Sequence, residues 1–216
     1  MPREKLAILG TSLFAPEAVD IIEDTGEFDV SVFVENQDRT RTGEKLLGRP
    51  IVWIGDAGPL ATDHRALCSL GTTERRRFVE DVEAMGFGFA TVVHPTARVS
   101  HRSVVGAGSF LSAGVIVGAN TRLEGQILVK NGVIIGHDTV IREFVTLSPG
   151  ANVAGGVTIG PGTYVGIGAT VLDRVRIGAG SMIAAGALVT KDVPDRVQVR
   201  GVPARIVEEY AEEAGR

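Results

Sequence analysis

The chain has 216 residues, with 22 Lys and Arg against 26 Asp and Glu, and a formal net charge of −4. This balance offers no basic surface to nucleic acid or to an anionic membrane, and no apolar run is long enough to cross a bilayer. The opening residues carry too short an apolar run for a signal peptide, and the single cysteine, Cys68, permits no intrachain disulfide. We therefore expect a cytoplasmic protein that neither enters a membrane nor binds nucleic acid.

The first ninety residues alternate between strand-like and helix-like patterns. The predicted strands are 6–9, 30–34, 51–54 and 66–70, and the predicted amphipathic helices are 15–24 and 73–85. The polar stretch 37–49 predicts a mobile loop. Alternation of this kind predicts a small parallel sheet flanked by helices, which we assign to residues 1–90.

Three loops follow the carboxyl ends of these predicted strands. Ligands of parallel sheets bind there, because the loops bring backbone N–H groups together. A carboxylate after the second strand can also accept hydrogen bonds from a ribose or a base. The sequence alone leaves open whether these loops bind a substrate or are ordinary turns. The residues concerned are Gly10, Thr11, Ser12, Glu35, Asn36 and Gly71.

From Val92 to Val193 the sequence divides into 17 blocks of six residues without an insertion or a deletion. The second position of every block is Val, Ile or Leu, the sixth is Ala, Ser, Thr, Val or Ile, and glycine recurs between them. A period of six fits neither an α-helix nor a continuous strand, but it fits short strands joined by tight corners. Three blocks make one triangular coil of 18 residues, and successive coils stack as parallel strands about 4.8 Å apart. The sequence therefore predicts a three-sided β-solenoid.

The 18-residue coil also predicts which residues are neighbours. Residues 18 apart occupy the same place in adjacent coils, so Gly155 is expected beside His137. His137 stands at a turn position, where most other blocks carry Ala, Gly or Pro. For the other histidines, His64, His94 and His101, a structural or solvated role is expected.

After the repeat, the turn over residues 192–195 is expected to close the last coil. Residues 205–213 predict a short terminal helix that covers the open end of the solenoid. Residues 196–216 are therefore assigned to a C-terminal cap.

The hexapeptide blocks resemble those of the hexapeptide-repeat acyltransferases, whose repeats form a left-handed parallel β-helix. With the α/β segment in front, the chain is similar over nearly its whole length to bacterial sugar acetyltransferases of the sialic acid and bacillosamine type. The most specific stretches are Ile-Gly-His-Asp-Thr-Val-Ile at 135–141 and Gly-Val-Pro-Ala-Arg at 201–205. The resemblance implies a Rossmann-like domain that binds a sugar nucleotide (1–90), a left-handed parallel β-helix (91–195) and a short C-terminal helix.

In that family the histidine of the Gly-His-Asp segment is the general base, and the resemblance implies this role for His137. A base is needed because an amine or hydroxyl that attacks a thioester must lose a proton, and a neutral imidazole accepts one near neutral pH. Asp138 follows directly and would orient the ring or favour the imidazolium. Gly155 has no side chain, so a pantetheine arm can approach it and its N–H can polarise the thioester carbonyl.

The resemblance also implies the cosubstrate and the assembly. In this family acetyl-CoA lies in the groove between neighbouring β-helices of a homotrimer, so each active site uses two chains, and no metal is needed. The second substrate is a small sugar that is nucleotide-linked or related. Arg205 would be a charge-assisted donor to the CoA phosphates, or else a solvated surface residue. The matching positions are Thr146, Gly155, Ile167, Ala185 and Arg205.

The sequence departs from the family's pattern at three places. The family's nucleotide loop, roughly Gly-Ala-Ser-Gly-His-Gly, is Gly-Thr-Ser-Leu-Phe-Ala at residues 10–15. Thr146 stands where many relatives have a second histidine, and Lys130 where they often have asparagine. The acetyl-transfer half of the expected function is therefore better supported than the nucleotide-sugar half.

Two other functions are compatible with such a solenoid. A non-catalytic scaffold or sugar-nucleotide-binding protein would share the repeat and would not bind acetyl-CoA. A metal enzyme of the carbonic-anhydrase type needs three histidines around one ion, whereas His101 and His137 are 36 residues, or two coils, apart. The main hypothesis is an acetyl-CoA-dependent acetyltransferase that acts by direct attack on an amino group, or less readily a hydroxyl, of a sugar.

Overall fold

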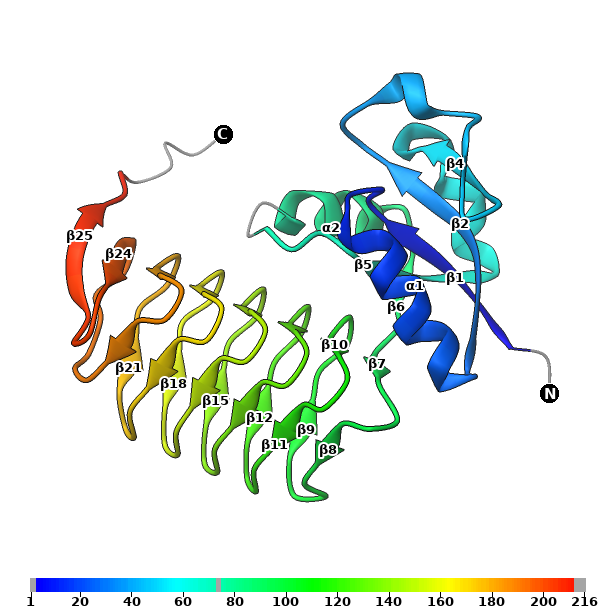
Figure 1. Cartoon of the computed structure of the whole chain (residues 1–216). Helices are drawn as coiled ribbons and strands as arrows, with labels where there is room; N and C mark the ends of the chain where they lie inside the picture. The colour runs from blue at the N-terminus through cyan, green and yellow to red at the C-terminus, as the bar shows by residue number, and fades with distance from the viewer. Residues whose placement is uncertain (1–2, 73–74, 212–216) are drawn as a thin grey trace. The chain divides into compact units, whose positions relative to one another are not determined.

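The computed structural model describes residues 3–72 and 75–211. The chain divides into two compact units, Met1–Pro95 and Thr96–Arg216, each with its own fold (Figure 1). Within the described residues, no helix is both long and apolar enough to span a membrane.

A single sheet forms the centre of the first unit. Its neighbouring strands run parallel, except that β3 and β4 are antiparallel, and their order is β3-β4-β2-β1-β5-β6. All four predicted strands are present, each within two residues of its expected bounds. The strands are β1 (Glu4–Leu9), β2 (Phe28–Glu35), β3 (Lys45–Leu46), β4 (Arg49–Trp53), β5 (His64–Cys68) and β6 (Gly88–Phe89).

Two helices of this unit pack against the sheet. Helix α1 (Phe14–Thr25) contacts β2, and helix α2 (Arg75–Ala84) contacts β5. The face of α1 that is buried repeats at helical spacing through Ala15, Ala18, Val19 and Ile22, which is the pattern of an amphipathic helix. Helix α1 is capped at its C-terminal end by Gly26, whose φ of +69° is the left-handed conformation common at this position. The second helix is confirmed from Arg75 onward; residues 73–74 of the predicted helix lie outside the described residues.

The stretch 37–49 was expected to be a loop, but it contains regular structure. A 3₁₀ turn, η1 (Arg39–Arg41), starts where the Asp38 side chain accepts a hydrogen bond from the Thr40 N–H at 3.0 Å. The strand β3 then pairs with β4 through a two-residue turn, in which Leu47 and Gly48 have φ values of +50° and +76°. Hairpin turns of this shape are usually signalled by Asn-Gly, so Leu-Gly gave no such signal. Two more 3₁₀ turns follow, η2 (Ile54–Asp56) and η3 (Gly58–Thr62).

Seventeen two-residue strands, β7 to β23, begin every six residues and coincide with the first two positions of the 17 predicted blocks. They are β7 (Val92–Val93), β8 (Arg98–Val99), β9 (Val104–Val105), β10 (Phe110–Leu111), β11 (Ile116–Val117), β12 (Arg122–Leu123), β13 (Leu128–Val129), β14 (Ile134–Ile135), β15 (Val140–Ile141), β16 (Thr146–Leu147), β17 (Asn152–Val153), β18 (Thr158–Ile159), β19 (Tyr164–Val165), β20 (Thr170–Val171), β21 (Arg176–Ile177), β22 (Met182–Ile183) and β23 (Leu188–Val189).

These strands form the three faces of a parallel β-helix (Figure 1). One face runs β8-β11-β14-β17-β20-β23, the second runs β9-β12-β15-β18-β21, and the third includes β10-β13-β16-β19-β22. Within each face, every strand pairs with the strand 18 residues away: Ile134, for example, lies between Ile116 and Asn152. The three-sided solenoid is therefore confirmed, and its stacked strands fit the expected left-handed β-helix.

The interior of the β-helix is built from the second and sixth positions of the blocks. From Leu111 to Val189, every second-position side chain is at most 2% exposed. The coils also approach closely at their corners: a Cβ added to Gly136 would lie 2.5 Å from the backbone nitrogen of Gly155. Glycine at such third positions therefore permits the coil spacing that brings residues 18 apart together.

The expected C-terminal helix is wrong for residues 205–209. Strand β24 (Val197–Arg200) extends one face beyond β22, and β25 (Arg205–Glu209) pairs with β24 antiparallel. Ile206 and Val207 are β-branched and favour a strand, and the pairing satisfies backbone groups at the edge that β24 would otherwise leave open. Residues 212–216, with the end of the predicted helix, lie outside the described residues.

Candidate active site

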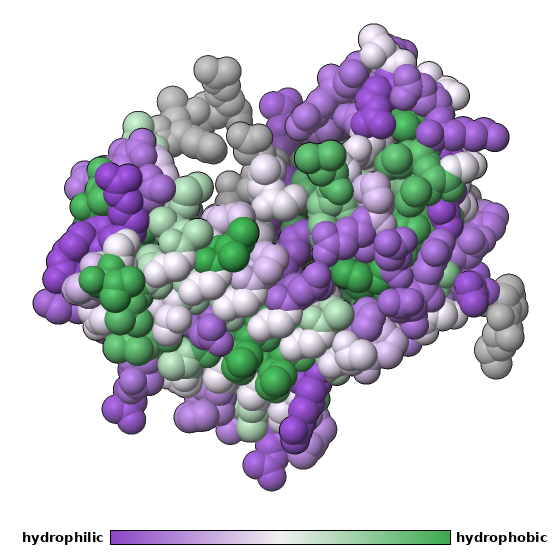
Figure 2. Space-filling model, in the orientation of Figure 1, coloured by the Kyte–Doolittle hydropathy of each residue, from purple (hydrophilic) through white to green (hydrophobic). Residues whose placement is uncertain are grey.

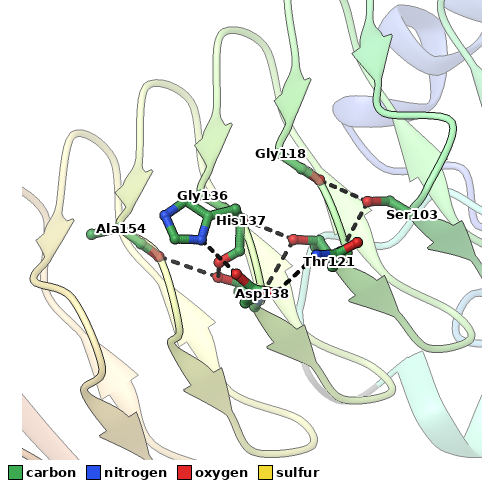
Figure 3. A network of polar contacts seen from close by, with 9 residues as sticks. Ser103, Gly118, Thr121, Gly136, His137, Asp138 and Ala154 are labelled. Atoms are coloured by element: carbon green, nitrogen blue, oxygen red, sulfur yellow. Dashed lines mark hydrogen bonds and ion pairs between the residues drawn. The ribbon is translucent and has the colours of Figure 1, made fainter.

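His137 stands on a corner of the β-helix, in the turn between β14 and β15. The backbone of this turn is fixed by the coils on both sides, because the Asp138 N–H donates to the Ala119 carbonyl and the Gly156 N–H donates to the His137 carbonyl, each at 2.8 Å. The His137 side chain is 71% exposed, so it points away from the interior. Figure 3 shows the ring projecting toward the coil that carries Ala154.

A carboxylate holds the imidazole. The Nδ1 atom of His137 lies 2.7 Å from Oδ2 of Asp138, and Nδ2 of Asn120 donates to Oδ1 of Asp138 at 3.1 Å. The hydrogen bond from His137, and then that from Asn120, lower the pKa of the Asp138 carboxyl below its ordinary value. An ionised carboxylate can only accept, so Nδ1 carries the proton and Nε2 of the neutral ring has a free lone pair.

The free edge of the ring faces Gly155 in the next coil. A Cβ added to Gly155 would lie 2.8 Å from Nε2 and 2.9 Å from Cε1 of His137. The neighbourhood of Gly155 thus differs from that of Gly136, where an added Cβ would meet backbone. No described residue accepts a hydrogen bond from the Gly155 N–H. The corner therefore brings together an imidazole, a carboxylate and a bare stretch of backbone, and Gly155 lies beside His137, as the 18-residue spacing predicted.

A ladder of hydroxyls on three successive coils stiffens this corner. Ser103, Thr121 and Thr139 are 18 residues apart, and their hydroxyls donate to the carbonyls of Gly118, Gly136 and Ala154 at 2.7, 2.8 and 3.2 Å (Figure 3). Two of these hydroxyls also accept from the next coil: the Thr121 N–H donates to the Ser103 hydroxyl, and the Thr139 N–H donates to the Thr121 hydroxyl. Thr121 and Thr139 are themselves buried, and because their hydrogen bonds link successive coils they fix the backbone that carries His137.

The residues expected to bind acetyl-CoA do not all share this corner. Ile167 and Ala185 stack in adjacent coils on a different corner, where the Gly186 N–H donates to the Ile167 carbonyl at 2.8 Å, and Ile167 is 59% exposed. Thr146 is buried within β16, between Leu128 and Tyr164. A single chain therefore does not gather these positions around His137.

Arg205 lies near the C-terminal end of the β-helix. It begins the exposed strand β25, and its Nη1 donates to the Ala204 carbonyl at 2.8 Å. A pocket opens here between the last coil and the β24–β25 hairpin. Its lining includes two cationic side chains, Lys191 and Arg205.

The first unit contains a second pocket, which joins the loops after β1, β2 and β5. Five of the six residues predicted to bind the substrate line it, namely Gly10, Thr11, Ser12, Glu35 and Asn36. Gly71 does not line the pocket, although its neighbour Leu70 does. The expectation that these loops come together is thus met for all but Gly71.

Two features of this pocket did not follow from the sequence. Burial alone would raise the pKa of the Glu35 carboxyl, but hydrogen bonds from the Thr11 hydroxyl and from the N–H groups of residues 36–38 lower it overall. Glu35 therefore organises the loops as an ionised group. Arg41, which lay in the stretch expected to be a loop, lines the pocket and donates from Nη1 to the Thr11 hydroxyl and to the Thr11 carbonyl, the latter at 3.1 Å.

The other histidines and the cysteine lie elsewhere. His64 begins β5, where its Nδ1 and Nε2 atoms contact Asp63 and Ser31 at 2.5 and 2.7 Å, which fits the structural role expected for it. His94 is buried and contacts Asp24 at 3.2 Å. Within the described part of the chain, no three His, Cys, Asp or Glu side chains are grouped so that they could hold a metal ion.

Burial raises the pKa of the Cys68 thiol to about 11, which keeps it in the unreactive thiol form.

The chain matches a family model and several solved structures. A model described as bacterial transferase hexapeptide (six repeats) matches residues 156–191. The acetyltransferase domain of PglB from Neisseria gonorrhoeae, in complex with acetyl coenzyme A, has a TM-score of 0.86 at 28% identity, over 95% of this chain and 100% of that one. No curated protein sequence matches.

Two further solved structures are similar over almost the whole chain. PerB from Caulobacter crescentus, in complex with CoA and GDP-perosamine, has a TM-score of 0.87 at 28% identity, over 94% of this chain and 97% of that one. WeeI from Acinetobacter baumannii has a TM-score of 0.85 at 26% identity, over 94% and 99%.

Together the fold and these matches show an acyltransferase whose β-helix is built from hexapeptide repeats. Within that class, its resemblance to the nucleotide-amino-sugar N-acetyltransferases, first drawn from the sequence motifs, is confirmed.

Proposed function

We propose that this protein transfers an acetyl group from acetyl-CoA to an amino group of a nucleotide-linked or related sugar, with His137 as the general base. A sugar hydroxyl is the alternative acceptor. The observation that carries the proposal is the exposed imidazole, with Nδ1 bonded to Asp138 and Nε2 turned to the bare backbone of Gly155. Similarity to proteins whose structures were solved in complex with acetyl coenzyme A, or with CoA and GDP-perosamine, supports both substrates.

The reaction is a direct attack without an acyl-enzyme. The neutral amine of the sugar attacks the thioester carbonyl carbon, a C–N bond forms, and Nε2 of His137 takes the proton that the amine loses. The tetrahedral intermediate then collapses, the C–S bond breaks, and the imidazolium returns its proton to the departing CoA thiolate. The products are an N-acetylated sugar and CoA, and His137 ends in its starting state.

Two neighbours support this proton transfer. Asp138 carries a full negative charge beside Nδ1 and favours the imidazolium that forms during attack. The Gly155 N–H is the candidate donor to the carbonyl oxygen, which gains negative charge in the intermediate. Both act on the same corner as the base, so no rearrangement of the chain is needed to assemble them.

Acetyl-CoA is proposed to lie between the β-helices of neighbouring subunits in a homotrimer. Ile167 and Ala185, two positions that the family resemblance assigns to acetyl-CoA, lie on a different corner from His137. A groove between two subunits would bring this corner of one chain next to the His137 corner of its neighbour. Arg205, which lines the pocket at the C-terminal end, would bind the CoA phosphates.

The surface of the β-helix carries exposed apolar side chains that a neighbouring subunit could cover. Ile116 and Ile134, which pair on one face, are 43% and 45% exposed. Figure 2 shows hydrophobic patches among polar groups on the face in view. Such apolar surface favours subunit contact.

The first unit is proposed to be Rossmann-like and to bind the nucleotide part of the sugar substrate. Numbered in chain order, its parallel strands are arranged 3-2-1-4-5, which is the doubly wound order 3-2-1-4-5-6 without its last strand. In such sheets the ligand binds at the carboxyl ends of the strands where the order reverses, which is between β1 and β5. The second pocket lies at this edge of the sheet and is lined by Gly10, Thr11, Ser12, Glu35 and Asn36. Gly71 follows Leu70, another lining residue, in the sequence.

The proposal is tested by measuring CoA thiol release from acetyl-CoA with a panel of GDP-, UDP- and dTDP-linked amino sugars and their hydroxyl counterparts. We expect thiol release with at least one amino sugar, and mass spectrometry should find an amide product that resists hydroxylamine. A hydroxylamine-labile ester would instead identify a hydroxyl acceptor. Titration calorimetry that detected no acetyl-CoA binding would contradict the proposal and favour a non-catalytic sugar-nucleotide-binding scaffold.

A further inference from the structure

The Asp138 carboxylate has a second partner that no sequence motif singled out. Asn120 lies one coil below Asp138 on the same corner and donates from Nδ2 to Oδ1 at 3.1 Å. The other carboxylate oxygen, Oδ2, is the one that contacts His137 at 2.7 Å. The two oxygens are therefore divided between an amide on one side and the imidazole on the other, which fixes the plane of the carboxylate.

The backbone places Asn120 for this contact. Asn120 and Asp138 both occupy the fifth position of their blocks and have left-handed φ values of +57° and +54°. Asn and Asp are the side-chain-bearing residues that adopt this conformation most readily. Because the two residues share one conformation and are 18 residues apart, their side chains leave the corner in parallel, and a donor is superimposed on an acceptor.

We propose that Asn120 is a positioning residue, which holds Asp138 so that His137 keeps its proton on Nδ1 and its lone pair on Nε2. This inference rests on the proposed role of His137 as base. An unheld carboxylate at a 57%-exposed position would rotate about its Cα–Cβ and Cβ–Cγ bonds, and the imidazole would then lose its fixed acceptor. The amide of Asn120 supplies no proton and carries no charge, so its contribution is orientation.

Other titratable and charged side chains stand one or two coils away on this corner, including His101 and Asp173, which occupy the same position in their blocks as His137. At the position that Asn120 and Asp138 share, Arg102 lies one coil below Asn120, and Arg174 lies two coils above Asp138. His137 is the one titratable group that acts on Asp138 among the described residues. A change at Asn120 will therefore reach the imidazole mainly through Asp138.

The test uses the full-length protein and needs no acceptor sugar. Side-chain ¹H–¹⁵N spectra report which ring nitrogen of each of the four histidines is protonated, and a His137→Ala variant assigns the His137 signal. In the wild type we expect the tautomer with the proton on Nδ1. In Asn120→Gly, where glycine accepts the left-handed backbone, we expect the Nε2-protonated tautomer to rise severalfold.

A second variant keeps the shape of the side chain and changes its charge. Asn120→Asp places a carboxylate beside that of Asp138, and the added negative charge favours the imidazolium. The midpoint of the His137 ¹⁵N titration is then expected to move to higher pH by roughly half a unit to one unit. Arg196→Gly is the matched control, because Arg196 also has a left-handed φ, +52°, but lies in a different turn. Its spectra should match those of the wild type.

Wild-type tautomer populations in Asn120→Gly, together with an unshifted midpoint in Asn120→Asp, would overturn the inference. Where an acceptor turns over, Asn120→Gly should lower kcat about fivefold and leave the KM for acetyl-CoA unchanged, which corresponds to the loss of one hydrogen bond. An equal kcat in Asn120→Gly and wild type would also contradict it. The spectra are independent of turnover, so a failure of the proposed function would appear in the thiol assay and not in them.

Discussion

The imidazole of His137 lies against the α-carbon of Gly155, 18 residues further along the chain. A methyl group on that carbon would lie 2.8 Å from Nε2, well inside van der Waals contact. The atom that is proposed to take the proton therefore faces a place where the chain presents only backbone. In the proposed mechanism this surface leaves room for a thioester and offers its N–H to the carbonyl oxygen, so the proposed base and the proposed oxyanion donor come from consecutive coils.

Replacement of His137 should remove the proton acceptor without disturbing the fold, because the side chain is exposed. We expect His137→Ala to lower kcat by about 10²- to 10⁴-fold, the usual contribution of a general base. His137→Gln, which keeps polarity and approximate size, should lose as much. CoA thiol release measures turnover, and calorimetry should find acetyl-CoA affinity little changed. Near-normal turnover in either variant would refute the assignment.

The pH dependence of the reaction should follow the imidazole and not the carboxylate. Hydrogen bonds from His137 and Asn120 lower the pKa of the Asp138 carboxyl, so it is already ionised at any pH where histidine is partly neutral. We expect kcat/KM to rise with pH as the ring loses its proton, and then to level off. Asp138→Asn removes the charge that favours imidazolium, so the rise should move to lower pH while the plateau falls about 10- to 100-fold.

The backbone of this variant should be preserved, because asparagine tolerates the φ of +54° at position 138, as Asn120 tolerates +57° in the coil below. Circular dichroism and Tm provide the check. A pH profile of Asp138→Asn that coincided with that of the wild type would show that the carboxylate does not act on the base.

A methyl group at Gly155 should displace the ring of His137. The backbone at Gly155 does not need a left-handed φ, so Gly155→Ala should fold, and the strain falls on a side chain and not on another coil. A displacement of about 1 Å in a reacting group can cost 100-fold, and we expect kcat to fall by about that factor. Gly58→Ala is the control, because a Cβ there meets nothing within 4 Å. Equal kcat in the two variants would contradict the proposed contact.

Glu35 should stabilise the first unit through its charge. Because its folded pKa is lowered, the stabilisation is present above the unfolded value of about 4.3 and is lost as pH falls through the folded value. Glu35→Gln replaces an acceptor oxygen with an amide group among N–H donors, so we expect Tm at pH 7 to fall by about 4–8 °C. This deficit should shrink as the pH falls below about 4.

Glu27→Gln is the matched control for this measurement, because Glu27 is exposed just before β2 begins. Its Tm should equal that of the wild type across the same pH range. A Glu35→Gln protein as stable as this control at pH 7 would mean that the carboxylate is not needed to hold the loops together.

The solenoid could be predicted from the sequence because its rule is local and repeats. Each block places one aliphatic side chain inward and turns at a corner, so a frame without insertions fixes the strands, the 18-residue register and the pairing of His137 with Gly155. The strands and helices of the first unit were also predictable from apolar periodicity. The hairpin β3–β4 was missed because Leu47 and Gly48 make a turn without the usual asparagine.

The C-terminal segment shows the opposite case. Residues 205–209 are compatible with a helix by composition. They form a strand instead, because the open edge of β24 offers unpaired backbone groups with which they pair. Likewise, the position of Glu35 after a strand indicated a pocket. Only the folded loops reveal that its oxygens are engaged by Thr11 and by backbone N–H groups, and that Arg41 reaches the same place.

The sequence by itself therefore determined the class of fold, the coil register and the position of His137 beside Gly155 on one corner, because these depend on spacing along the chain. The tertiary structure decided which atoms meet: the ring nitrogen that is free, the amide that holds Asp138, and the partner that closes the last strand. Such contacts depend on side-chain rotamers and on backbone edges, which spacing does not encode.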